Sequence, residues 1–313
     1  MIAEGRSSFH LAAVITDESH VDYHLHMTYA ASQGKQMQLD GKPVQAYSTL
    51  VGQFPVIKLS SEDHEITAGP PQQRRRFFNI LLSQASPRYL ADLKEYDRIV
   101  KQRNRMLEMA AQGRMDHRHD LEAWNDQLIR KAEAISLARQ SLVEDLNEEL
   151  QTLYRQLAGD SAGLHIVYKP HVPLHRQTSY ADGFQAQLKR VYARERGQCQ
   201  TLVGPHRDDF QFLINDRDVR RYASRGEHKS VMISLKAAEV ALIRKKLDKT
   251  PVVLLDDLFA ELDWQRVQAV LNMALTGVQR FITGTSFDQQ MISSRLPKEG
   301  VIYRMQQGQL TRV

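Results

Sequence analysis

The sequence predicts an α/β protein with a mixed sheet and an inserted helical hairpin arm. Three observations support this fold class: a period-two segment near the start, two long helical stretches in the middle, and alternating strand and helix patterns after residue 163. We therefore expect a β-rich part at 1–68, a helical arm at 69–163 and a mostly parallel α/β part at 164–313.

The β-rich part is typical of a short antiparallel meander. Apolar and polar residues alternate over VDYHLHMTY, the apolar set being Val21, Tyr23, Leu25 and Met27. Turn-forming residues follow within ASQGKQ and at Asp40-Gly41. His24 and His26 lack an acidic or cysteine ligand at a suitable spacing, so we interpret them as solvent-side strand positions and not as a metal site.

The helical arm begins after Pro70 and Pro71, which interrupt the strand region. Apolar residues then recur at helical spacing in two stretches, at Tyr89, Leu93, Tyr96, Val100 and Leu107, and at Leu128, Ala132, Ile135, Leu142, Leu146, Leu150, Leu153 and Leu157. The polar QGRMDHRHD between them predicts a loop at the tip, and Gly159 to Gly163 ends the arm.

The last part alternates between the two element types. Strands are predicted at LHIVYKP, DDFQFLIND, PVVLLDD and QRFITGT, and helices at YADGFQAQLKRVYARER, HKSVMISLKAAEVALIRKKL and DWQRVQAVLNMAL. The four consecutive apolar residues of VVLL indicate a strand covered on both faces, as in the centre of a parallel sheet. The carboxyl end of such a strand is where open α/β sheets bind ligands.

Two aspartates, Asp256 and Asp257, end this apolar strand. Successive strand residues point to opposite faces, so the two carboxylates can serve different tasks. One can hold Mg²⁺ and the other can orient a water or accept its proton, which is the pattern of a Walker B segment. The competing interpretation is a strand that ends in a polar turn.

Two neighbouring segments favour the phosphate-binding interpretation. Ser224, Arg225 and Gly226 open a predicted helix, and the free N–H groups at a helix start suit phosphate oxygens. Asp263 precedes another predicted helix. Both Ser224 and Asp263 also fit the simpler role of helix N-cap.

Composition excludes some classes of protein. The 313 residues are 42% hydrophobic and 25% charged, with a net charge of +5, and contain no apolar run of membrane-spanning length. The single cysteine, Cys199, excludes an internal disulfide and suits a reducing cytosol. We expect a cytoplasmic protein without a membrane partner, and the mild basic charge is compatible with a polyanionic partner.

The order of SRGEHK, VVLLDD and AELD resembles the signature, Walker B and D-loop segments of ABC-type ATPase heads of the SMC group. Two longer segments are more specific. TLVGPHRDDFQF and SSEDHEITAGPPQQRRRFFNILLSQASPRYL resemble landmarks of the RecF family of recombinational-repair proteins, and the similarity covers nearly the whole chain.

The resemblance implies an ATP-dependent homodimer that binds DNA at gaps and single-strand/double-strand junctions and helps RecO and RecR load RecA. Asp256 would handle Mg²⁺ through water, and Asp257 would be the catalytic carboxylate. Ser224 and Gly226 would meet the γ-phosphate of ATP bound to the partner subunit, and Asp263 would lie at the dimer seam. The DNA-contacting residues stay unassigned.

The sequence also departs from the family pattern. No G-x-x-x-x-G-K-[ST] phosphate loop occurs, and MIAEGRSSFH is similar to the segment that follows that loop in the family. We therefore expect this chain, as a fragment, to bind ATP weakly and to be inactive alone. Glu227 puts a negative charge in the signature segment, and Ser61 replaces the usual proline of the S-P-E-D landmark.

Three hypotheses remain. The chain is a RecF-type ATPase subunit whose sequence begins late, a genuine short DNA-binding or assembly subunit that does not hydrolyse ATP, or a structural coiled-coil protein of SMC type. GPHRDD and the short arm count against the third. Translating the in-frame nucleotides upstream of Met1 separates the first two, because only the first predicts a G-K-[ST] loop there.

Basic clusters offer weaker signals. They occur at Arg74–Arg76, at Lys189, Arg190, Arg194 and Arg196, and at Arg244, Lys245, Lys246 and Lys249. Each fits a solvated face more often than a DNA contact. Three successive helical residues fan out by about 100° each, so at least one of Arg74–Arg76 should pair internally. His171 and His175 flank Pro173, and we interpret them as surface residues.

Overall fold

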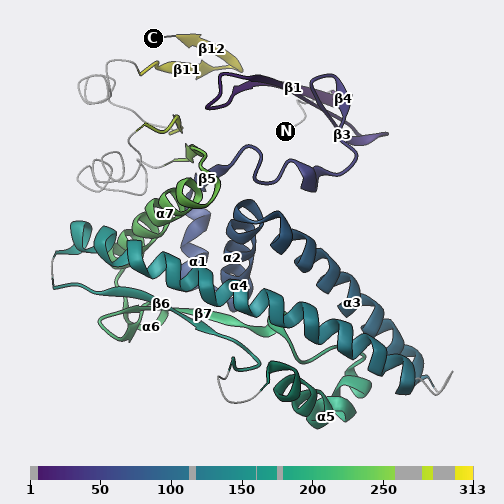
Figure 1. Cartoon of the computed structure of the whole chain (residues 1–313). Coiled ribbons are helices and arrows are strands. Elements are labelled where there is room, and N and C mark those ends of the chain that lie inside the picture. Colours follow the sequence, from purple (N-terminus) through teal and green to yellow (C-terminus); the bar gives the residue numbers. More distant parts are fainter. Residues whose placement is uncertain are drawn as a thin grey trace.

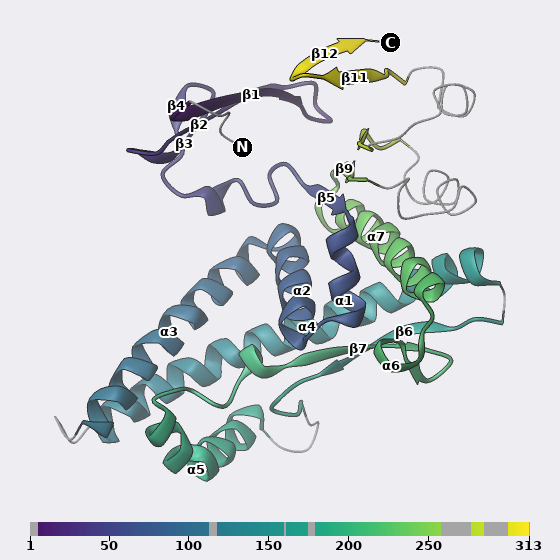
Figure 2. The same ribbon diagram turned by 180° about the vertical axis from the view of Figure 1, so that it is seen from behind.

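The computed structural model describes residues 6–112, 118–159, 161–174, 179–257, 277–284 and 300–312. Most of the helices lie below the N-terminal sheet in Figure 1 and, from behind, in Figure 2, and another group of strands lies among these helices. The described α-helices are α1 (His64–Ala68), α2 (Pro71–Ala85), α3 (Pro87–Ala111), α4 (Arg118–Ala158), α5 (Tyr180–Gln198), α6 (Val219–Tyr222) and α7 (Arg225–Leu247).

The predicted antiparallel meander is confirmed. It consists of β1 (Ser8–Thr16), β2 (Asp22–Ala30), β3 (Gly34–Leu39) and β4 (Lys42–Pro43), each antiparallel to the next. Asp40 and Gly41, between β3 and β4, have φ values of 50° and 74°, which a two-residue hairpin turn of this hand requires. The short helix η1 (Tyr47–Thr49) then leads toward the second sheet.

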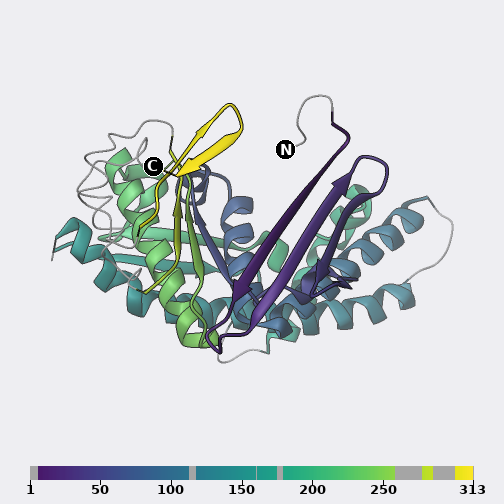
Figure 3. The same ribbon diagram turned by 90° about the horizontal axis from the view of Figure 1, so that it is seen from above.

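The second sheet is parallel and contains the predicted central strand. Its order is β10 (Arg280–Ile282), β9 (Val252–Leu255) and β5 (Val56–Leu59), with β9 paired on both sides. Figure 3 shows these strands beside the meander, above the helices. The strand β9 is thus central, as predicted, but its burial alternates: Val253 and Leu255 are buried, whereas Val252 and Leu254 are only partly buried, so one face of β9 is less completely covered than the other.

The expectation that the remaining strands would join this parallel sheet is wrong. The strands β6 (Leu164–Lys169), β7 (Asp209–Ile214) and β8 (Arg217–Asp218) form their own antiparallel sheet, in which Ile166 lies opposite Phe212. Their burial alternates residue by residue, because α4 covers one face and solvent reaches the other. A final hairpin consists of β11 (Tyr303–Gln306) and β12 (Gln309–Arg312).

The helical arm is confirmed as three helices. α3 and α4 lie side by side over much of their length (Figure 1), and both predicted apolar seams face the core, with Tyr96, Leu107, Leu128 and Ile135 at most 1% exposed. Gly159, at φ 93°, follows the last residue of α4, as expected for a helix C-terminus. α4 also packs against α7 and β6, so it connects the arm to the rest of the molecule.

Aromatic stacking joins the arm to the antiparallel sheet. The rings of Phe78 in α2 and Phe210 in β7 stack with centroids 3.8 Å apart. Within the part of the chain that the structure describes, no helix is long and apolar enough to cross a membrane. The predicted helix DWQRVQAVLNMAL, with Asp263, lies outside the described residues.

Candidate functional site

The acid pair stands where the sequence predicted, at the carboxyl end of the central strand β9. Asp256 continues the sheet hydrogen bonding, because its amide donates to the Leu59 carbonyl of β5 at 2.9 Å. Thr283, which directly follows the neighbouring strand β10, donates its amide to the Leu255 carbonyl at 2.9 Å. Three parallel strands therefore hold the backbone of the acid pair in place.

Asp256 is held as a carboxylate. Its Oδ1 accepts a hydrogen bond from Thr283 Oγ1 at 2.7 Å, and its Oδ2 lies 3.5 Å from Lys58 Nζ. The Thr283 hydrogen bond, with the charge of Lys58 adding to it, holds the pKa of the Asp256 carboxyl below its usual value. The side chain is about half exposed, so it can reach water and a hydrated cation.

Asp257 has an unsatisfied oxygen. Its backbone is left-handed, at φ 54°, a conformation that aspartate adopts more readily than most residues. Its amide donates to Thr283 Oγ1 at 3.3 Å. Oδ1 is buried and accepts no hydrogen bond from the residues that the structure describes. A buried carboxylate oxygen of this kind calls for a water or a ligand as its partner.

A cavity of about 330 Å³ joins the acid pair to the start of α7. It is lined by Asp256 and Asp257, by the turn after β5 and by the first residues of α7, namely Leu59, Ser60, Ser61, Asp63, His64, Arg225, His228, Lys229, Met232 and Ile233. The turn contains the helix η2 (Ser61–Asp63), which is stabilised by a capping box between Ser60 and Asp63. Ser61 is thus accommodated where the family pattern has proline.

The start of α7 is capped by its own side chains. Ser224 is the N-cap residue, and its Oγ accepts a hydrogen bond from the Glu227 amide at 3.2 Å. The Glu227 carboxylate in turn accepts from the Ser224 amide at 2.7 Å and from its hydroxyl at 2.8 Å. These bonds lower the pKa of Glu227, so the negative charge noted in the sequence is fixed at this helix start.

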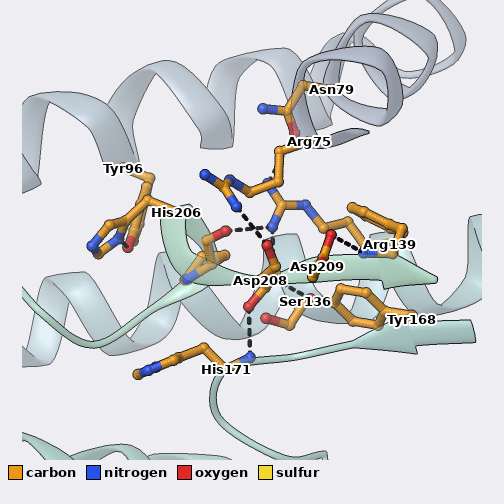
Figure 4. A network of polar contacts seen from close by, with 12 residues as sticks. Arg75, Asn79, Tyr96, Ser136, Arg139, Tyr168, His171, His206, Asp208 and Asp209 are labelled. Atoms are coloured by element: carbon orange, nitrogen blue, oxygen red, sulfur yellow. Dashed lines mark hydrogen bonds and ion pairs between the residues drawn. The ribbon is translucent and has the colours of Figure 1, made fainter. Parts of the chain in front are cut away.

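The segment GPHRDD has a structural role that sequence reasoning did not assign. It turns through η3 (Pro205–Arg207) into a buried polar cluster between the arm and β6–β7 (Figure 4). Arg139 of α4 donates to Asp208 Oδ2 at 2.6 Å and to the Pro205 carbonyl at 2.7 Å. Tyr168 also donates to Asp208, and the His171 amide donates to Asp208 Oδ1 at 2.8 Å.

His206 of the same segment is held as a neutral ring. Its Nε2 lies 3.0 Å from the Thr201 carbonyl, which can only accept, so Nε2 carries the proton and donates. The Nδ1 atom then accepts from the Tyr96 hydroxyl at 2.6 Å. Burial lowers the pKa of His206 to about 4, in agreement with this arrangement.

Two of the three basic clusters contain side chains that pair with carboxylates of this chain. Arg74 is buried and pairs with Asp209 at 2.7 Å, which confirms that one of the three arginines pairs internally. In the cluster at the end of α7, Lys246 pairs with Asp145 at 2.7 Å and Lys245 lies 3.5 Å from Glu148. These lysines therefore already have carboxylate partners on α4.

The surface interpretation of His171 is wrong, because the residue is half-buried and its Nδ1 is buried without a hydrogen-bond partner among the described residues. His175 lies outside the described residues. No group of three or more histidine, cysteine or acidic side chains in the described part of the chain is arranged to hold a metal ion. A cation at Asp256 and Asp257 would therefore keep several waters as ligands, which suits Mg²⁺.

The mixed sheets and the inserted helical arm give the chain the fold of an ABC/SMC-type ATPase head. No family model matches the sequence. The fold is similar to the solved structure of the recombination mediator protein RecF with ATP in the RecFOR pathway, with a TM-score of 0.88 over 99% of this chain and 81% of that chain at 23% identity. An SMC head bound to the winged-helix domain of ScpA matches with a TM-score of 0.50 and 10% identity.

Sequence relatives identify the particular family. The chain is 32% identical over 289 residues to the DNA replication and repair protein RecF of Agathobacter rectalis, covering 92% of this chain and 77% of the relative. It is 34% identical over 288 residues to RecF of Chloroherpeton thalassium, covering 88% and 77%. The chain belongs to the RecF family.

Proposed function

We propose that this chain acts in DNA replication and recombinational repair as a RecF-type protein in the cytoplasm. It binds DNA at gaps and single-strand/double-strand junctions in an ATP-dependent homodimer, and it helps RecO and RecR load RecA. The observation that carries this proposal is the acid pair of β9, which shares a cavity of about 330 Å³ with the start of α7. Family membership supports the repair role.

The residues at this cavity fit a nucleotide with Mg²⁺. Bound MgATP would supply negatively charged phosphates that both subunits can contact. It would also supply the bond to the γ-phosphate that water can hydrolyse. Asp256, held ionised by Thr283 and Lys58, would hold Mg²⁺ through water. Asp257, with its unsatisfied Oδ1, would be the catalytic carboxylate and would orient the attacking water or accept its proton.

The remaining assigned residues would act across the dimer. Ser224 and Gly226, at the N-terminus of α7, would face the γ-phosphate of the nucleotide on the partner subunit. Asp263 would lie at the dimer seam. Contact between Ser224 and phosphate requires its hydroxyl to leave Glu227, to which it donates at 2.8 Å.

The bond between Ser224 and Glu227 favours an alternative. With the Ser224 amide and hydroxyl both occupied, the chain would serve as a DNA-binding or assembly subunit that does not hydrolyse ATP. The two possibilities differ in whether MgATP changes the affinity for DNA.

Fluorescence anisotropy with labelled DNA tests the proposal. We expect the chain to bind a duplex with a single-stranded gap more tightly than a fully paired duplex of equal length. Equal affinity for both would overturn the proposed DNA preference. If MgATP tightens binding in the wild type and not in Asp256→Asn, the nucleotide role is supported. Because the sequence contains no G-x-x-x-x-G-K-[ST] loop, weak ATP binding is expected of this chain alone, so only a positive effect of MgATP separates the two possibilities.

A further inference from the structure

A second cavity, of about 860 Å³, shares no lining residue with the cavity at the acid pair. Its walls come from the chain around Leu50–Val56 and from helices α2, α3 and α4. Part of its polar wall is the buried cluster of Figure 4, because Arg75, Arg139 and His206 all line it. Its volume is in the range of ligand-binding pockets.

The polar cluster beside this cavity has one positive charge in excess. It contains three guanidinium groups and two carboxylates. Arg74 pairs with Asp209 at 2.7 Å and Arg139 pairs with Asp208 at 2.6 Å. Arg75 donates only to a neutral group, the Asp208 carbonyl, at 2.7 Å. The half-buried Arg75 is therefore the cation without a carboxylate of its own.

The electrostatics of Arg75 agree with a missing anion. Burial, and after it the charge of Arg139, lowers the pKa of Arg75, so its charged form is incompletely compensated. The next residue, Arg76, is exposed, lines the same cavity and makes no hydrogen bond or ion pair with the described residues. Asp97 also lines the cavity and feels the charge of Arg139, but among the described residues it forms no hydrogen bond or ion pair with Arg75 or Arg76.

The rest of the wall suits a nucleobase and not only a charge. The side-chain amides of Gln72 and Gln73 from α2 offer both donors and acceptors, which base edges require. Asn79 adds only donors, because its Oδ1 already accepts from Tyr89 and Arg139. Phe54 and Ile80 add apolar surface, and Ile80 is 48% exposed. An acidic peptide would pair with the arginines, but its carboxylates only accept hydrogen bonds and would leave the acceptor oxygens of the amides unused.

We propose that this cavity binds one nucleotide unit of single-stranded DNA, with its phosphate on Arg75 and Arg76 and its base against the amides and Ile80. The inference rests on the proposed DNA-binding function and deepens it, since it names a place where the unpaired strand is held. Guanidinium groups suit this role because they bind phosphate oxygens in pairs.

The test uses the whole chain and a fluorescein-labelled oligothymidylate in fluorescence anisotropy. Arg76→Gln removes one cation, and Ile80→Glu places a negative charge in the cavity without emptying the core. Each should weaken binding by about fivefold or more, and Arg76→Gln should reduce the slope of log affinity against log salt by about 0.7. Circular dichroism melts show whether each variant is folded.

Matched controls separate local contact from general charge. Arg155→Gln removes an exposed arginine near the end of α4, and Leu137→Glu adds the same charge as Ile80→Glu at a side chain that is 53% exposed. Both should bind within about twofold of the wild type, because long-range effects of one exposed charge are screened.

The outcomes distinguish the cavity from the function. If the wild type binds gapped DNA and the cavity variants match their controls, this site is refuted while the proposed function stands. If the wild type binds no DNA, both fail. If polyglutamate displaces the oligonucleotide from the wild type and binds in an Arg76-dependent way with higher affinity, the cavity is a site for an acidic peptide and our proposal is overturned.

Discussion

Replacing Arg139 with methionine should destabilise the protein more than any surface change of the same kind. The Arg139 side chain is 2% exposed, and its partner Asp208 is 1% exposed, at 2.6 Å. Methionine fills much of the same space but removes the charge and every hydrogen bond. Asp208 would keep Tyr168 and the His171 amide as donors, yet its buried carboxylate would lose its paired cation and keep only the charge of Arg75, which donates to the Asp208 carbonyl and not to the carboxylate.

The expected magnitude follows from burial. Removing one partner of a buried ion pair costs about 3–5 kcal/mol, because the remaining charge is uncompensated. The pair of Arg98 with Glu95 provides the control, since its distance is 2.7 Å but its side chains are 54% and 36% exposed. Exposed pairs contribute about 0.2–1 kcal/mol, so Arg98→Met should change the free energy of unfolding by about 1 kcal/mol or less.

Urea unfolding followed by far-ultraviolet circular dichroism measures both changes. A double-mutant cycle with Asp208→Asn completes the experiment, because removing both charges should restore part of the loss. The argument is refuted if Arg139→Met costs no more than Arg98→Met, or if the double variant is as unstable as the sum of the two single variants.

Of three further predictions, two are measured by urea unfolding and the third by DNA-binding anisotropy. Because the folded pKa of His206 is about 4 and its unfolded value is about 6.5, the unfolded state binds more protons as the pH falls, and between pH 7.5 and 5.5 the wild type should lose about 1 kcal/mol more stability than His206→Gln; equal slopes would contradict this. Gly204→Ala puts a methyl group into the Tyr96 hydroxyl at φ 134° and should cost at least about 2 kcal/mol, whereas Gly197→Ala, with open space around it in α5, should stabilise slightly. The double change Lys245→Gln and Lys246→Gln should leave gapped-DNA affinity within about twofold, because both lysines already pair with α4; a loss above about fivefold would show that this cluster contacts DNA.

Local patterns were sufficient to predict much of the candidate site. The unbroken VVLL run placed the acid pair at the end of a central parallel strand, and β9 has that position. Ser224 was predicted as a possible helix cap, and it caps α7. By contrast, the bond from Thr283 to Asp256 joins residues 27 positions apart on neighbouring strands, so no local pattern could indicate it.

The direction of strand pairing was likewise not predictable from local sequence patterns. Alternation of strands and helices suggested a parallel sheet for β6 and β7, but the strands pair antiparallel. In the folded protein the burial of both strands alternates residue by residue, which fits an antiparallel sheet with one more open face. Pairing itself depends on contacts between distant segments, here with Ile166 opposite Phe212.

The sequence by itself determined where the helices and strands form, because spacing and turn residues act within a few positions along the chain. It also determined that two carboxylates follow a buried strand. Only the tertiary structure decided which charges are neutralised. Arg139 meets Asp208 over a separation of 69 positions and Arg74 meets Asp209 over 135, which leaves Arg75 as the one of these three arginines without a paired carboxylate. Charge compensation depends on distance in space and on exclusion of water, and neither is a property of residue order.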